Sequence, residues 1–462
     1  MIRIFRHYLP RGLLILGLSE ILVLWGALYA GILLKSASLG ADSQVSMALT
    51  GKAFLFIGVI LVVMTAFGLY QRDLKEGQWG YFPRLVVSLS FCFIVFCAFL
   101  PLVPSLILPP ATLAYVVMVA LCGTMLTRLL YVAITSRTAV NRQVLVLGTG
   151  QRARAVRALA KGGPGRPGFS IVGFVPCGDE EDGGGSLILR GTQSLSVIAK
   201  HNRVTEIVVA NRDRRLSIPI NELLECKLSG MRVVDLTTFF ERESGCIELA
   251  SLNASWLVFA DGFQQGFVKT WVKRVFDVLA STALLVLCFP IMLLTALAIK
   301  LEDGGPVFYR QDRVGRDGRA FGLLKFRSMR VNAEKDGAPQ WATKDDSRAT
   351  RVGGLIRKVR IDELPQALNV LQGDMSFVGP RPERPFFVDK LAQSIPYYRY
   401  RHAIKPGITG WAQVRYPYGA SVEDAVEKLK YDLYYVKNNS LFLDIIILFQ
   451  TLQVLIFQDG AR

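Results

Sequence analysis

The apolar stretch Val275–Ile299, VFDVLASTALLVLCFPIMLLTALAI, decides how the second half of this chain meets its surroundings. The stretch is longer than the roughly 20 apolar residues that a membrane crossing needs. Proline at position 290 removes an intrahelical hydrogen bond and kinks a helix. Basic residues stand on both sides, with Lys273 and Arg274 before the stretch and Lys300 after it. The stretch is therefore predicted to be a membrane helix that changes direction at Pro290.

Two arrangements fit this helix. It is either an ordinary kinked span or a re-entrant helix (275–300) that enters the membrane, breaks at Phe289–Pro290 and returns to the same face. Hydropathy alone does not separate them. Between Asp303 and Lys437, however, Lys and Arg outnumber Asp and Glu, and a full crossing would place this basic region outside. Lys and Arg are favoured on the cytoplasmic side, so the charge bias favours the re-entrant helix.

Four more apolar stretches occupy the beginning of the chain: Gly12–Leu34, Ala53–Tyr70, Leu85–Leu108 and Ala111–Thr135. We interpret them as a four-helix transmembrane domain covering residues 1–140. The first is too long for the apolar part of a signal peptide, so an uncleaved span is expected. Basic residues at 3–11, 72–84 and 137–142 place both ends of this domain in the cytoplasm. Glu20 and Arg128 are charges within the spans, and Arg128 is expected to reach for the membrane interface.

The composition agrees with a membrane protein that has a large cytoplasmic part. The chain has 462 residues, of which 51% are hydrophobic, and 54 Lys and Arg against 37 Asp and Glu, a net charge of +17. This combination excludes a disordered tail, a collagen-like fibre and a small disulfide scaffold. The seven cysteines form no CxxC pair, so reduced thiols are expected. A nucleic acid is not expected as a partner, because no aromatic stacking platform is interleaved with the basic residues.

Residues 141–262 are predicted to form a Rossmann-like α/β domain. Four short apolar runs read as strands separated by helical patterns: Val144–Leu147, Ile171–Val175, Glu206–Ala210 and Val233–Leu236. After the first run, Gly148 and Gly150 could bring backbone N–H groups to a phosphate at a helix N-terminus. The acidic residue expected at the end of the second strand is missing, since Phe174-Val175-Pro176-Cys177 stands there. A structural or regulatory fold is therefore favoured over nucleotide binding.

The last part, residues 263–462, carries the residues suited to chemistry. Asp362-Glu363 precedes Pro365, and proline is tolerated only in the first turn of a helix, so this pair is predicted at a helix N-terminus. The positive end of the helix dipole keeps carboxylates ionised there. Such a carboxylate can act as a nucleophile or a Mg²⁺ ligand, or it can simply cap the helix. Arg381, held between two prolines, suits an anionic substrate or is a surface charge.

Four motifs in this part occur in a fixed order after the proline-broken helix: KFRSM from Lys325, DELPQ from Asp362, GDMSFVGPRPE from Gly373 and KPGITGWAQ from Lys405. Together they resemble the bacterial monotopic phosphoglycosyl transferases over about residues 265–462. The spans and the α/β domain resemble the long members, the polyprenyl-phosphate hexose-1-phosphate transferases that prime exopolysaccharide synthesis. Many members have Ser-Pro at the helix break, where this chain has Phe289-Pro290. Because of this departure, the angle of the re-entrant helix at Pro290 does not follow from the resemblance. The reaction that the resemblance implies is not affected.

The resemblance implies a two-step transfer at the cytoplasmic face of the bacterial inner membrane. Asp362 would attack the β-phosphorus of a UDP-sugar, release UMP and pass the sugar phosphate to undecaprenyl phosphate, starting an exopolysaccharide or O-antigen. Free Asp titrates at about 3.9, so this nucleophile is already ionised. Mg²⁺ on Asp362 and Glu363 would offset the repulsion between anions, together with a group of cations at Lys325, Arg327, Arg357 and Arg381. Glu363 is left as a metal ligand, an orienting group or a base.

The resemblance also implies contacts with inner-membrane lipids and a homodimer paired through the middle domain. The sequence does not indicate which sugar is transferred. Two other functions compete: a nucleotide-sugar oxidoreductase or epimerase working at the Gly148 loop, and a non-enzymatic scaffold. The oxidoreductase or epimerase needs a Tyr-x-x-x-Lys base, a pattern that Tyr431 and Tyr435 do not supply. Two further helices are expected at Ser421–Lys437, capped by Ser421 and Asp424, and at Leu441–Phe457, lying on the membrane or packed on the catalytic core.

Overall fold

A computed structural model of the chain describes residues 2–5, 7–39, 48–70, 80–99, 110–137, 142–161, 168–177, 189, 194–210, 218–249, 252, 254–263, 266–330, 348–417, 419 and 421–457. The chain divides into two compact units. The first comprises Met1–Arg3 and Tyr8–Arg242, and the second comprises Ile4–His7 and Glu243–Arg462. Residues 243–262 thus belong to the second unit, whereas the predicted boundary lies at 262/263. The other predicted boundary, at residue 140, lies outside the described residues, and the three-domain division stays a prediction.

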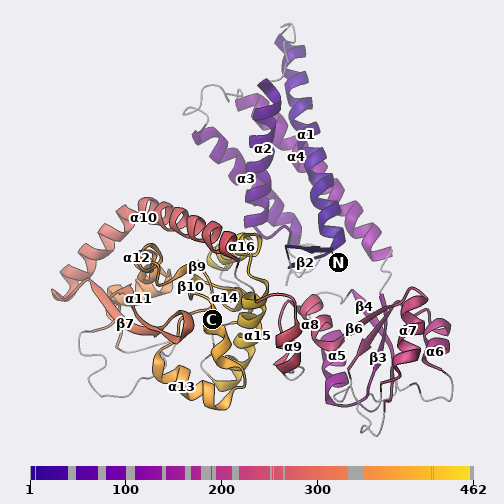
Figure 1. Cartoon of the computed structure of the whole chain (residues 1–462). Coiled ribbons are helices and arrows are strands. Elements are labelled where there is room, and N and C mark those ends of the chain that lie inside the picture. Colours follow the sequence, from indigo (N-terminus) through magenta and orange to yellow (C-terminus); the bar gives the residue numbers. More distant parts are fainter. Residues whose placement is uncertain are drawn as a thin grey trace. The chain divides into compact units, whose positions relative to one another are not determined.

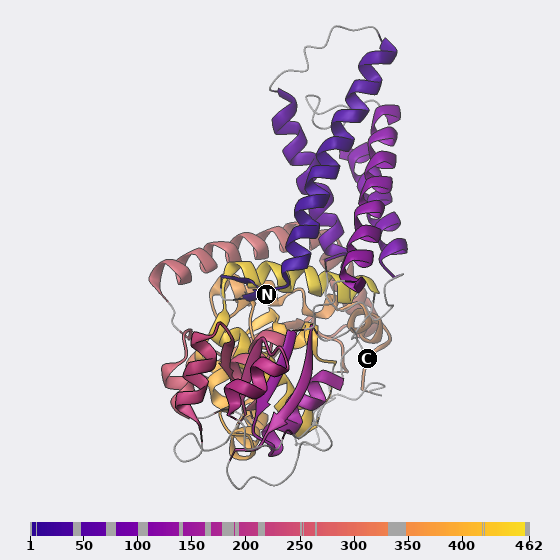
Figure 2. The same cartoon turned by 90° about the vertical axis from the view of Figure 1, so that its right-hand side faces the viewer.

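Two short strands open the chain, β1 (Ile2–Ile4) and β2 (His7–Leu9), of which Ile4 and His7 belong to the second unit. Four apolar helices of the first unit follow them. Each predicted span contains a helix, and Figures 1 and 2 show these helices as a bundle: α1 (Arg11–Leu39), α2 (Ala48–Ala66), α3 (Tyr81–Phe99) and α4 (Pro110–Arg137). Leu24, Ile60, Leu89 and Val116 pack in its core. Within the described residues, α1 and α4 are long and apolar enough to cross a membrane, while α2 and α3 contain shorter apolar segments. The loops whose charges predict the orientation, at 40–47, 71–79 and 100–109, lie outside the described residues.

The two charges inside the bundle pair with each other. Arg128 Nε lies 2.7 Å from Glu20 Oε1, and both side chains are almost fully buried. Arg128 Nη1 also donates to the carbonyl oxygen of Leu69 at 2.9 Å, and the Tyr70 hydroxyl donates to Glu20. Arg128 therefore pairs within the bundle, and its place at the membrane interface stays a prediction. Pairing inside the bundle removes the cost of an isolated charge in an apolar environment.

The rest of the first unit is an α/β region with a four-stranded parallel sheet in the order β4-β3-β5-β6. The strands coincide with the four predicted runs to within two residues at each end: β3 (Arg142–Leu147), β4 (Phe169–Val175), β5 (Glu206–Val209) and β6 (Arg232–Asp235). Helices α5 (Gln151–Lys161) and α8 (Leu236–Ser244) cover one face, and α6 (Leu195–His201) and α7 (Ile220–Leu228) cover the other. The predicted α/β character is confirmed.

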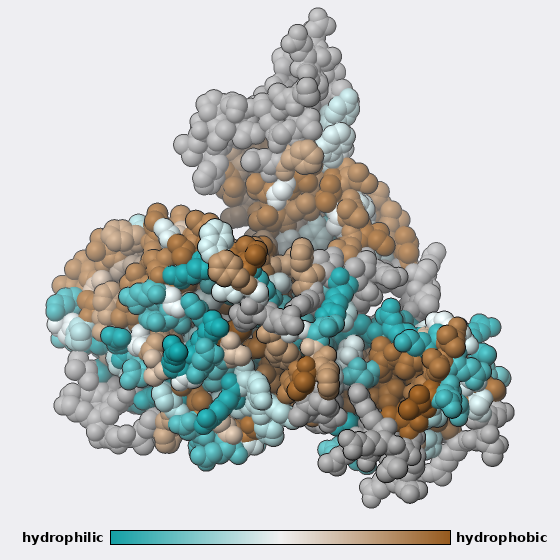
Figure 3. All heavy atoms as spheres, viewed as in Figure 1, coloured by the Kyte–Doolittle hydropathy of each residue, from teal (hydrophilic) through white to brown (hydrophobic). Residues whose placement is uncertain are grey.

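The second unit is organised along one long helix, α10 (Phe267–Asp303), which contains Pro290 and ends at Gly304 in a left-handed conformation with φ 70°. The helix is not interrupted at Phe289–Pro290, so a change of direction there is a bend within the helix. Figure 1 shows α10 bent along its course. Its polarity is inverted relative to a helix of a soluble protein. Asp277, Ser281 and Thr295 are buried, whereas Leu279, Leu287 and Leu294 are exposed, and Figure 3 shows hydrophobic residues gathered over this helix.

The remaining elements of the second unit lie on the polar side of α10. The strands form an antiparallel pair, β7 (Phe308–Val314) with β8 (Ala320–Phe326), and a parallel pair, β9 (Ser376–Val378) with β10 (Gly407–Thr409). The helices and 3-10 turns are α9 (Ala254–Phe259), η6 (Arg316–Gly318), α11 (Arg351–Lys358), η7 (Ile361–Glu363), α12 (Gln366–Gln372), α13 (Pro385–Ser394), η8 (Tyr398–Ala403), α14 (Trp411–Arg415), α15 (Val422–Asn438) and α16 (Leu441–Phe457). Ser421 and Asp424 form the expected capping box at the start of α15. Helix α16 packs on the core through Leu443 and Ile447.

Candidate active site

The acidic pair lies immediately before a helix, as its sequence predicts. Asp362 and Glu363 end the turn η7, and Pro365 is the residue that precedes α12. Arg360, just upstream, adopts a left-handed conformation with φ 60°. A non-glycine residue in this region is strained by about 1–3 kcal/mol, and such strain concentrates at functional sites. The turn presents both carboxylates on the polar side of the unit, beside strand β8.

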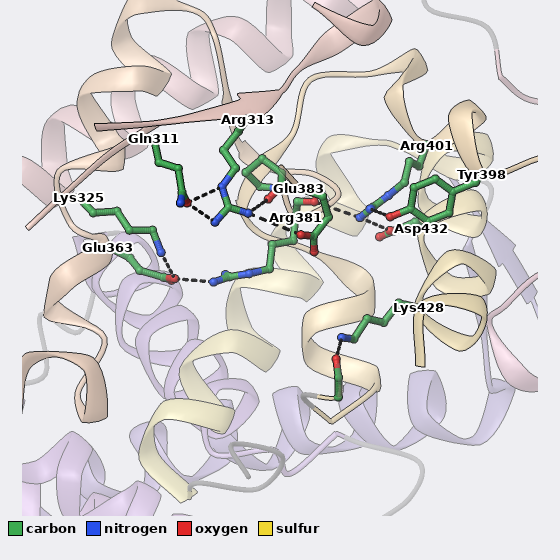
Figure 4. A network of polar contacts seen from close by, with 12 residues as sticks. Gln311, Arg313, Lys325, Glu363, Arg381, Glu383, Tyr398, Arg401, Lys428 and Asp432 are labelled. Atoms are coloured by element: carbon green, nitrogen blue, oxygen red, sulfur yellow. Dashed lines mark hydrogen bonds and ion pairs between the residues drawn. The ribbon is translucent and has the colours of Figure 1, made fainter. Parts of the chain in front are cut away.

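Glu363 is held by two cations from distant parts of the sequence. Its Oε1 atom accepts hydrogen bonds from Lys325 Nζ at 3.1 Å and from Arg381 Nη2 at 2.7 Å, as Figure 4 shows. Arg360 Nη1 lies 3.9 Å from the other oxygen, Oε2. Charge-assisted hydrogen bonds of this length are among the stronger polar contacts in proteins. The orientation of the Glu363 carboxylate is therefore set by its partners before any substrate arrives.

Asp362 is less constrained than its neighbour. Its closest cation is Lys325, whose Nζ atom lies 4.0 Å from Oδ2, beyond hydrogen-bond distance. No hydrogen bond to the Asp362 carboxylate occurs among the described residues. The residue is nevertheless buried, with 7% of its surface exposed. Asp362 is thus a carboxylate in a protected, basic site whose oxygens are not occupied by protein donors.

The pKa values of the two acids are shifted in opposite directions. Burial raises the pKa of Asp362, and the negative charge of Glu363 adds to this, while Lys325 opposes it. Burial would also raise the pKa of Glu363, but the charges of Arg381 and Lys325 outweigh it and hold that pKa well below its usual range. Two adjacent carboxyl groups with separated pKa values are suited to different chemical roles. Of the two carboxylates, Asp362 is therefore the more basic and Glu363 the more readily ionised.

Lys325 reaches the acids because β8 is locked to α12. The side chain of Asn369 on α12 accepts from the backbone N–H of Leu324 at 2.9 Å and donates to the carbonyl oxygen of Gly322 at 2.9 Å. These two bonds fix the middle of β8 against the helix that follows the acidic pair. In the β7–β8 register Lys325 is opposite Tyr309. Lys325 therefore projects from the same face of the hairpin as Gln311 and Arg313, which follow Tyr309 at intervals of two residues.

The other two predicted phosphate-binding cations are placed differently. Arg327 is buried and pairs with Asp303 in the last turn of α10. In the Lys325-Phe326-Arg327 sequence, Lys325 contacts the acidic pair and Arg327 does not. Arg357 lies in the last turn of α11, half-buried, and no ion pair to it occurs among the described residues. The structure thus brings Lys325 and Arg381 to the acidic pair, whereas it brings neither Arg327 nor Arg357 into contact with Asp362 or Glu363. Their phosphate-binding role stays a prediction.

The predicted site residues do not include three residues of this region: Arg360, Gln311 and Arg313. Arg360 is three residues before Glu363, a spacing that places two side chains on one side of a helical turn. Gln311 Oε1 accepts from Arg313 Nη2 at 2.7 Å, and Arg313 Nη1 donates to the carbonyl oxygen of Pro382 at 3.0 Å. Because side chains two apart on a strand point to the same face, the sequence could have predicted that Gln311 and Arg313 lie side by side. Their place on the same face as Lys325 depends on how β7 pairs with β8.

The residues present are compatible with Mg²⁺ between the acids. Within the described residues no group of three His, Cys, Asp or Glu side chains lies close enough to hold a metal alone. Mg²⁺ in phosphoryl-transfer sites is usually bound by only one or two carboxylates, with substrate phosphates and water completing its shell. The Asp362 carboxylate and Oε2 of Glu363 can serve as these ligands, because Lys325 and Arg381 occupy only Oε1. This donor set fits the ion.

The glycine loop of the first unit lies where its sequence predicts, between β3 and α5. Gly148 has a φ of 121°, a conformation that favours glycine, and its N–H donates to the carbonyl oxygen of Val175 at 2.8 Å. Gly150 begins the turn into α5, with Ala153 N donating to its carbonyl oxygen at 3.0 Å. The N–H of Gly148 is therefore used inside the fold. Nucleotide binding at Gly148 and Gly150 stays a prediction.

Comparisons with known proteins point to one family. A family model described as bacterial sugar transferase matches residues 268–458. A UDP-N-acetylgalactosamine-undecaprenyl-phosphate N-acetylgalactosaminephosphotransferase of Aeromonas hydrophila is 45% identical over 240 residues, which are 52% of this chain and 56% of the relative. A UDP-glucose:undecaprenyl-phosphate glucose-1-phosphate transferase of Escherichia coli K12 is 35% identical over 293 residues, covering 62% of this chain and 61% of the relative.

A third relative is matched over most of its own length. A UDP-glucose:undecaprenyl-phosphate glucose-1-phosphate transferase of Caulobacter vibrioides is 44% identical over 191 residues, 41% of this chain and 71% of the relative. For the first two relatives the chain spans little more than half of the relative's length. The family match begins at residue 268, so it contains all but the first residue of α10 and all the acidic and basic residues of the site.

Proposed function

Because the chain belongs to the bacterial sugar transferase family, we propose that it is a membrane phosphoglycosyl transferase. The reaction moves a sugar 1-phosphate from a UDP-sugar to undecaprenyl phosphate. The observation that carries this proposal is the state of Asp362: a buried carboxylate with no protein hydrogen-bond donor among the described residues, next to a Glu363 that Lys325 and Arg381 already hold. That arrangement leaves one acid free to react and keeps the other as a fixed anion.

In the proposed first step an oxygen of Asp362 attacks the β-phosphorus of the UDP-sugar. A bond between this oxygen and phosphorus forms, the bond from phosphorus to the bridging oxygen breaks, and UMP leaves with the electron pair. In the second step a phosphate oxygen of undecaprenyl phosphate attacks the same phosphorus and the Asp362 carboxylate is regenerated. No proton has to be removed from either nucleophile when both are ionised, so the site needs cations more than it needs a base.

Lys325 and Arg381 supply this positive charge. Both already lie within 3.1 Å of Glu363, so their positions are set before substrate binds. Preorganised charges in a protected site stabilise developing charge without reorganising at the moment of reaction, and removing one such group typically costs about 10²–10³ in rate. Glu363 acts as the orienting group. It holds the two cations beside Asp362 and prevents them from forming ion pairs with Asp362 itself.

Mg²⁺ is part of the proposal. When bound, the ion would neutralise negative charge on the transferring phosphoryl group. Asp362 and Oε2 of Glu363 would contact it, while Oε1 of Glu363 stays with Lys325 and Arg381. Two measurements test this part: UMP release after EDTA treatment and after adding Mg²⁺ back, and binding of Mn²⁺ to the protein by paramagnetic resonance. Mn²⁺ binding that is unchanged in Asp362→Asn and Glu363→Gln would contradict the assignment of these ligands.

A re-entrant placement of α10 is supported by the contacts at its two ends. Near its start, Arg274 donates to the carbonyl oxygens of Val370 and Leu371 at 2.5 and 2.7 Å. At its other end, Glu302 accepts from the backbone N–H of Arg351 at 2.7 Å. Both ends of the helix are therefore attached to one compact unit, which is difficult to reconcile with a full crossing between them. The apolar outer face of α10 would lie in the lipid, with the catalytic residues beneath it on the cytoplasmic side of the inner membrane.

The sugar and the pathway are also matters for proposal. The relatives named above act on UDP-N-acetylgalactosamine and on UDP-glucose, so these two sugars are the first candidates here. The product would prime an exopolysaccharide or an O-antigen. A homodimer and contacts with inner-membrane lipids remain expectations from the family resemblance.

One assay tests the function. The purified protein is supplied with undecaprenyl phosphate, Mg²⁺ and each of a panel of UDP-sugars, and UMP is measured. We expect UMP release with at least one sugar, loss of release in Asp362→Asn, and normal release in Asp389→Asn, a matched change at an exposed position. Without undecaprenyl phosphate, mass spectrometry should find a sugar phosphate on Asp362. Full activity of Asp362→Asn would show that this residue is not the nucleophile.

A further inference from the structure

The segment that carries Arg381 is held at every one of its carbonyl oxygens. Gly407 N donates to the oxygen of Pro380 at 2.9 Å, and Val314 N donates to that of Glu383 at 2.9 Å. The two oxygens between them accept from arginine side chains, Arg401 Nη2 to Arg381 at 3.0 Å and Arg313 Nη1 to Pro382 at 3.0 Å. Figure 4 shows Arg313 and Arg401 on opposite sides of this segment. Its backbone is therefore fixed from several elements.

Arg401 is the most enclosed member of this set. It lies on η8 with only 6% of its surface exposed, and its guanidinium has two further partners. Nη1 donates to the Tyr398 hydroxyl at 2.8 Å, and Nη2 lies 2.7 Å from Oδ2 of Asp432. Asp432, on α15, is 2% exposed. Desolvating two charges costs free energy, so the burial of this pair is by itself weak evidence that it stabilises the fold.

The reaction itself gives Arg401 and Asp432 no role, because neither contacts Asp362 or Glu363. Arg401 does, however, contact the backbone of Arg381, the residue that holds Glu363, and Asp432 contacts Arg401. The chain of contacts runs from Asp432 to the guanidinium of Arg401, from there to the carbonyl oxygen of Arg381, and from the side chain of Arg381 to Glu363 Oε1 at 2.7 Å. A shift of about 1 Å at a site of this kind can cost on the order of 100-fold in rate.

We infer that Arg401, oriented by Asp432, is a positioning residue for the proposed transfer reaction: it fixes the backbone of Arg381 so that the Arg381 guanidinium meets Glu363. This inference rests on the proposed function. Tyr398 supports the same guanidinium from its other side.

A double-mutant cycle tests the inference. Arg401→Lys keeps the positive charge beside Asp432 but cannot reach Asp432, Tyr398 and the Arg381 carbonyl at once. We expect it to lower kcat/KM for UMP release by about 10–100-fold in the wild-type background, mainly through kcat. In the Arg381→Ala background the same change should cost less than about threefold, because the group that Arg401 positions is already gone. Equal losses in both backgrounds would overturn the inference.

Arg399→Lys is the matched control. Arg399 lies two residues away, 73% exposed, in a surface pair with Asp389, and its change should leave kcat/KM unaltered. If Arg401→Lys does not fold, Tyr398→Phe, which removes only the hydroxyl, takes its place in the cycle with the same pattern of expected losses at a smaller size. A third variant, Asp432→Asn, should show the same pattern of kcat/KM losses in the two backgrounds as Arg401→Lys.

A measurement that does not depend on turnover separates failure of this inference from failure of the function. Hydrogen exchange of the amides of Val314 and Gly407, which donate to the Arg381 segment, should be faster in Arg401→Lys than in Arg399→Lys. If the wild type releases no UMP but this exchange still accelerates, the proposed reaction is wrong and the structural coupling stands. Unchanged exchange would show that Arg401 does not hold the segment.

Discussion

The ammonium of Lys325 lies 3.1 Å from Oε1 of Glu363. The same nitrogen is 4.0 Å from Asp362 Oδ2. Lys325 therefore acts on both acids through its charge but forms a hydrogen bond only with Glu363. The pKa of Asp362 therefore responds to two neighbours of opposite charge: Glu363 raises it and Lys325 lowers it. Removing either neighbour should move the acid side of the pH–rate profile, in opposite directions.

Glu363→Gln removes the neighbouring negative charge. Without it the pKa of Asp362 falls, so Asp362 stays ionised to lower pH and the acid limb of kcat/KM moves down the pH scale. At neutral pH the rate should still fall, on the order of 100-fold, because Lys325 and Arg381 lose the group that orients them. The measurement is UMP release across pH, with Glu427→Gln at a half-exposed position as the control. An acid limb that stays in place or rises would contradict the assignment.

Lys325→Met is the opposite test. Two adjacent buried carboxyl groups then share fewer cations, the pKa of Asp362 rises further, and the acid limb of kcat/KM moves to higher pH. Loss of one preorganised charge should also lower kcat/KM by about 10²–10³ at its best pH. Lys390→Met, an exposed change on α13, is the control and should leave the profile unaltered. A Lys325→Met profile shifted toward acid would mean that Asp362 is not the titrating group.

The placement of the acidic pair could be predicted from the sequence because it depends on neighbours along the chain. Pro365 can only begin a helix, so Asp362 and Glu363 had to precede one. The fate of Arg327 depends instead on Asp303, which lies at the end of a long helix, and that contact has no local signal. Glu20 and Arg128 are an equally distant pair: nothing in either span indicates the other, and only the packing of α1 against α4 joins them.

The burial of Asp277 is a second feature that local pattern could not supply. The residue is a lone acid in an apolar stretch, and its role depends on β9. Asp277 Oδ1 accepts from the Ser376 hydroxyl and from the N–H of Phe377, both at 3.0 Å. Together with Arg274, it attaches the first half of α10 to β9 and α12. The helix is thereby an integral part of the second unit.

Asp277→Ala should loosen this attachment. The change leaves the N–H of Phe377 without its acceptor, at a cost of about 1–3 kcal/mol, while the Ser376 hydroxyl can still donate to the carbonyl oxygen of Val378 at 3.0 Å. For a unit of this size that corresponds to a fall in Tm of very roughly 2–12 °C, since each kcal/mol shifts Tm by about 2–4 °C. Tryptophan fluorescence during heating in detergent provides the measurement. Asp389→Ala, which breaks only an exposed pair, should leave Tm nearly unchanged, and equal Tm values for the two variants would exclude the anchoring role.

The topology of α10 is open to a direct labelling test. If α10 re-enters, the turn between β7 and β8 faces the cytoplasm. Arg319, in that turn, is exposed and has an ordinary backbone conformation with φ −73°. In a background whose seven cysteines are replaced, Arg319→Cys should react with a membrane-impermeant maleimide only after the cells are permeabilised. A cysteine at Ser43, between the first two predicted spans, should react in intact cells and is the positive control.

The expected protection has two physical grounds. The region after α10 is basic, which disfavours its transfer across the membrane, and contacts at both ends of α10 attach it to one unit. A full span would have to break one of these sets of contacts and carry Asp362 and Glu363 to the outside, away from a nucleotide sugar in the cytoplasm. Labelling of Arg319→Cys in intact cells would therefore refute the re-entrant helix, and with it the cytoplasmic reaction proposed for this site.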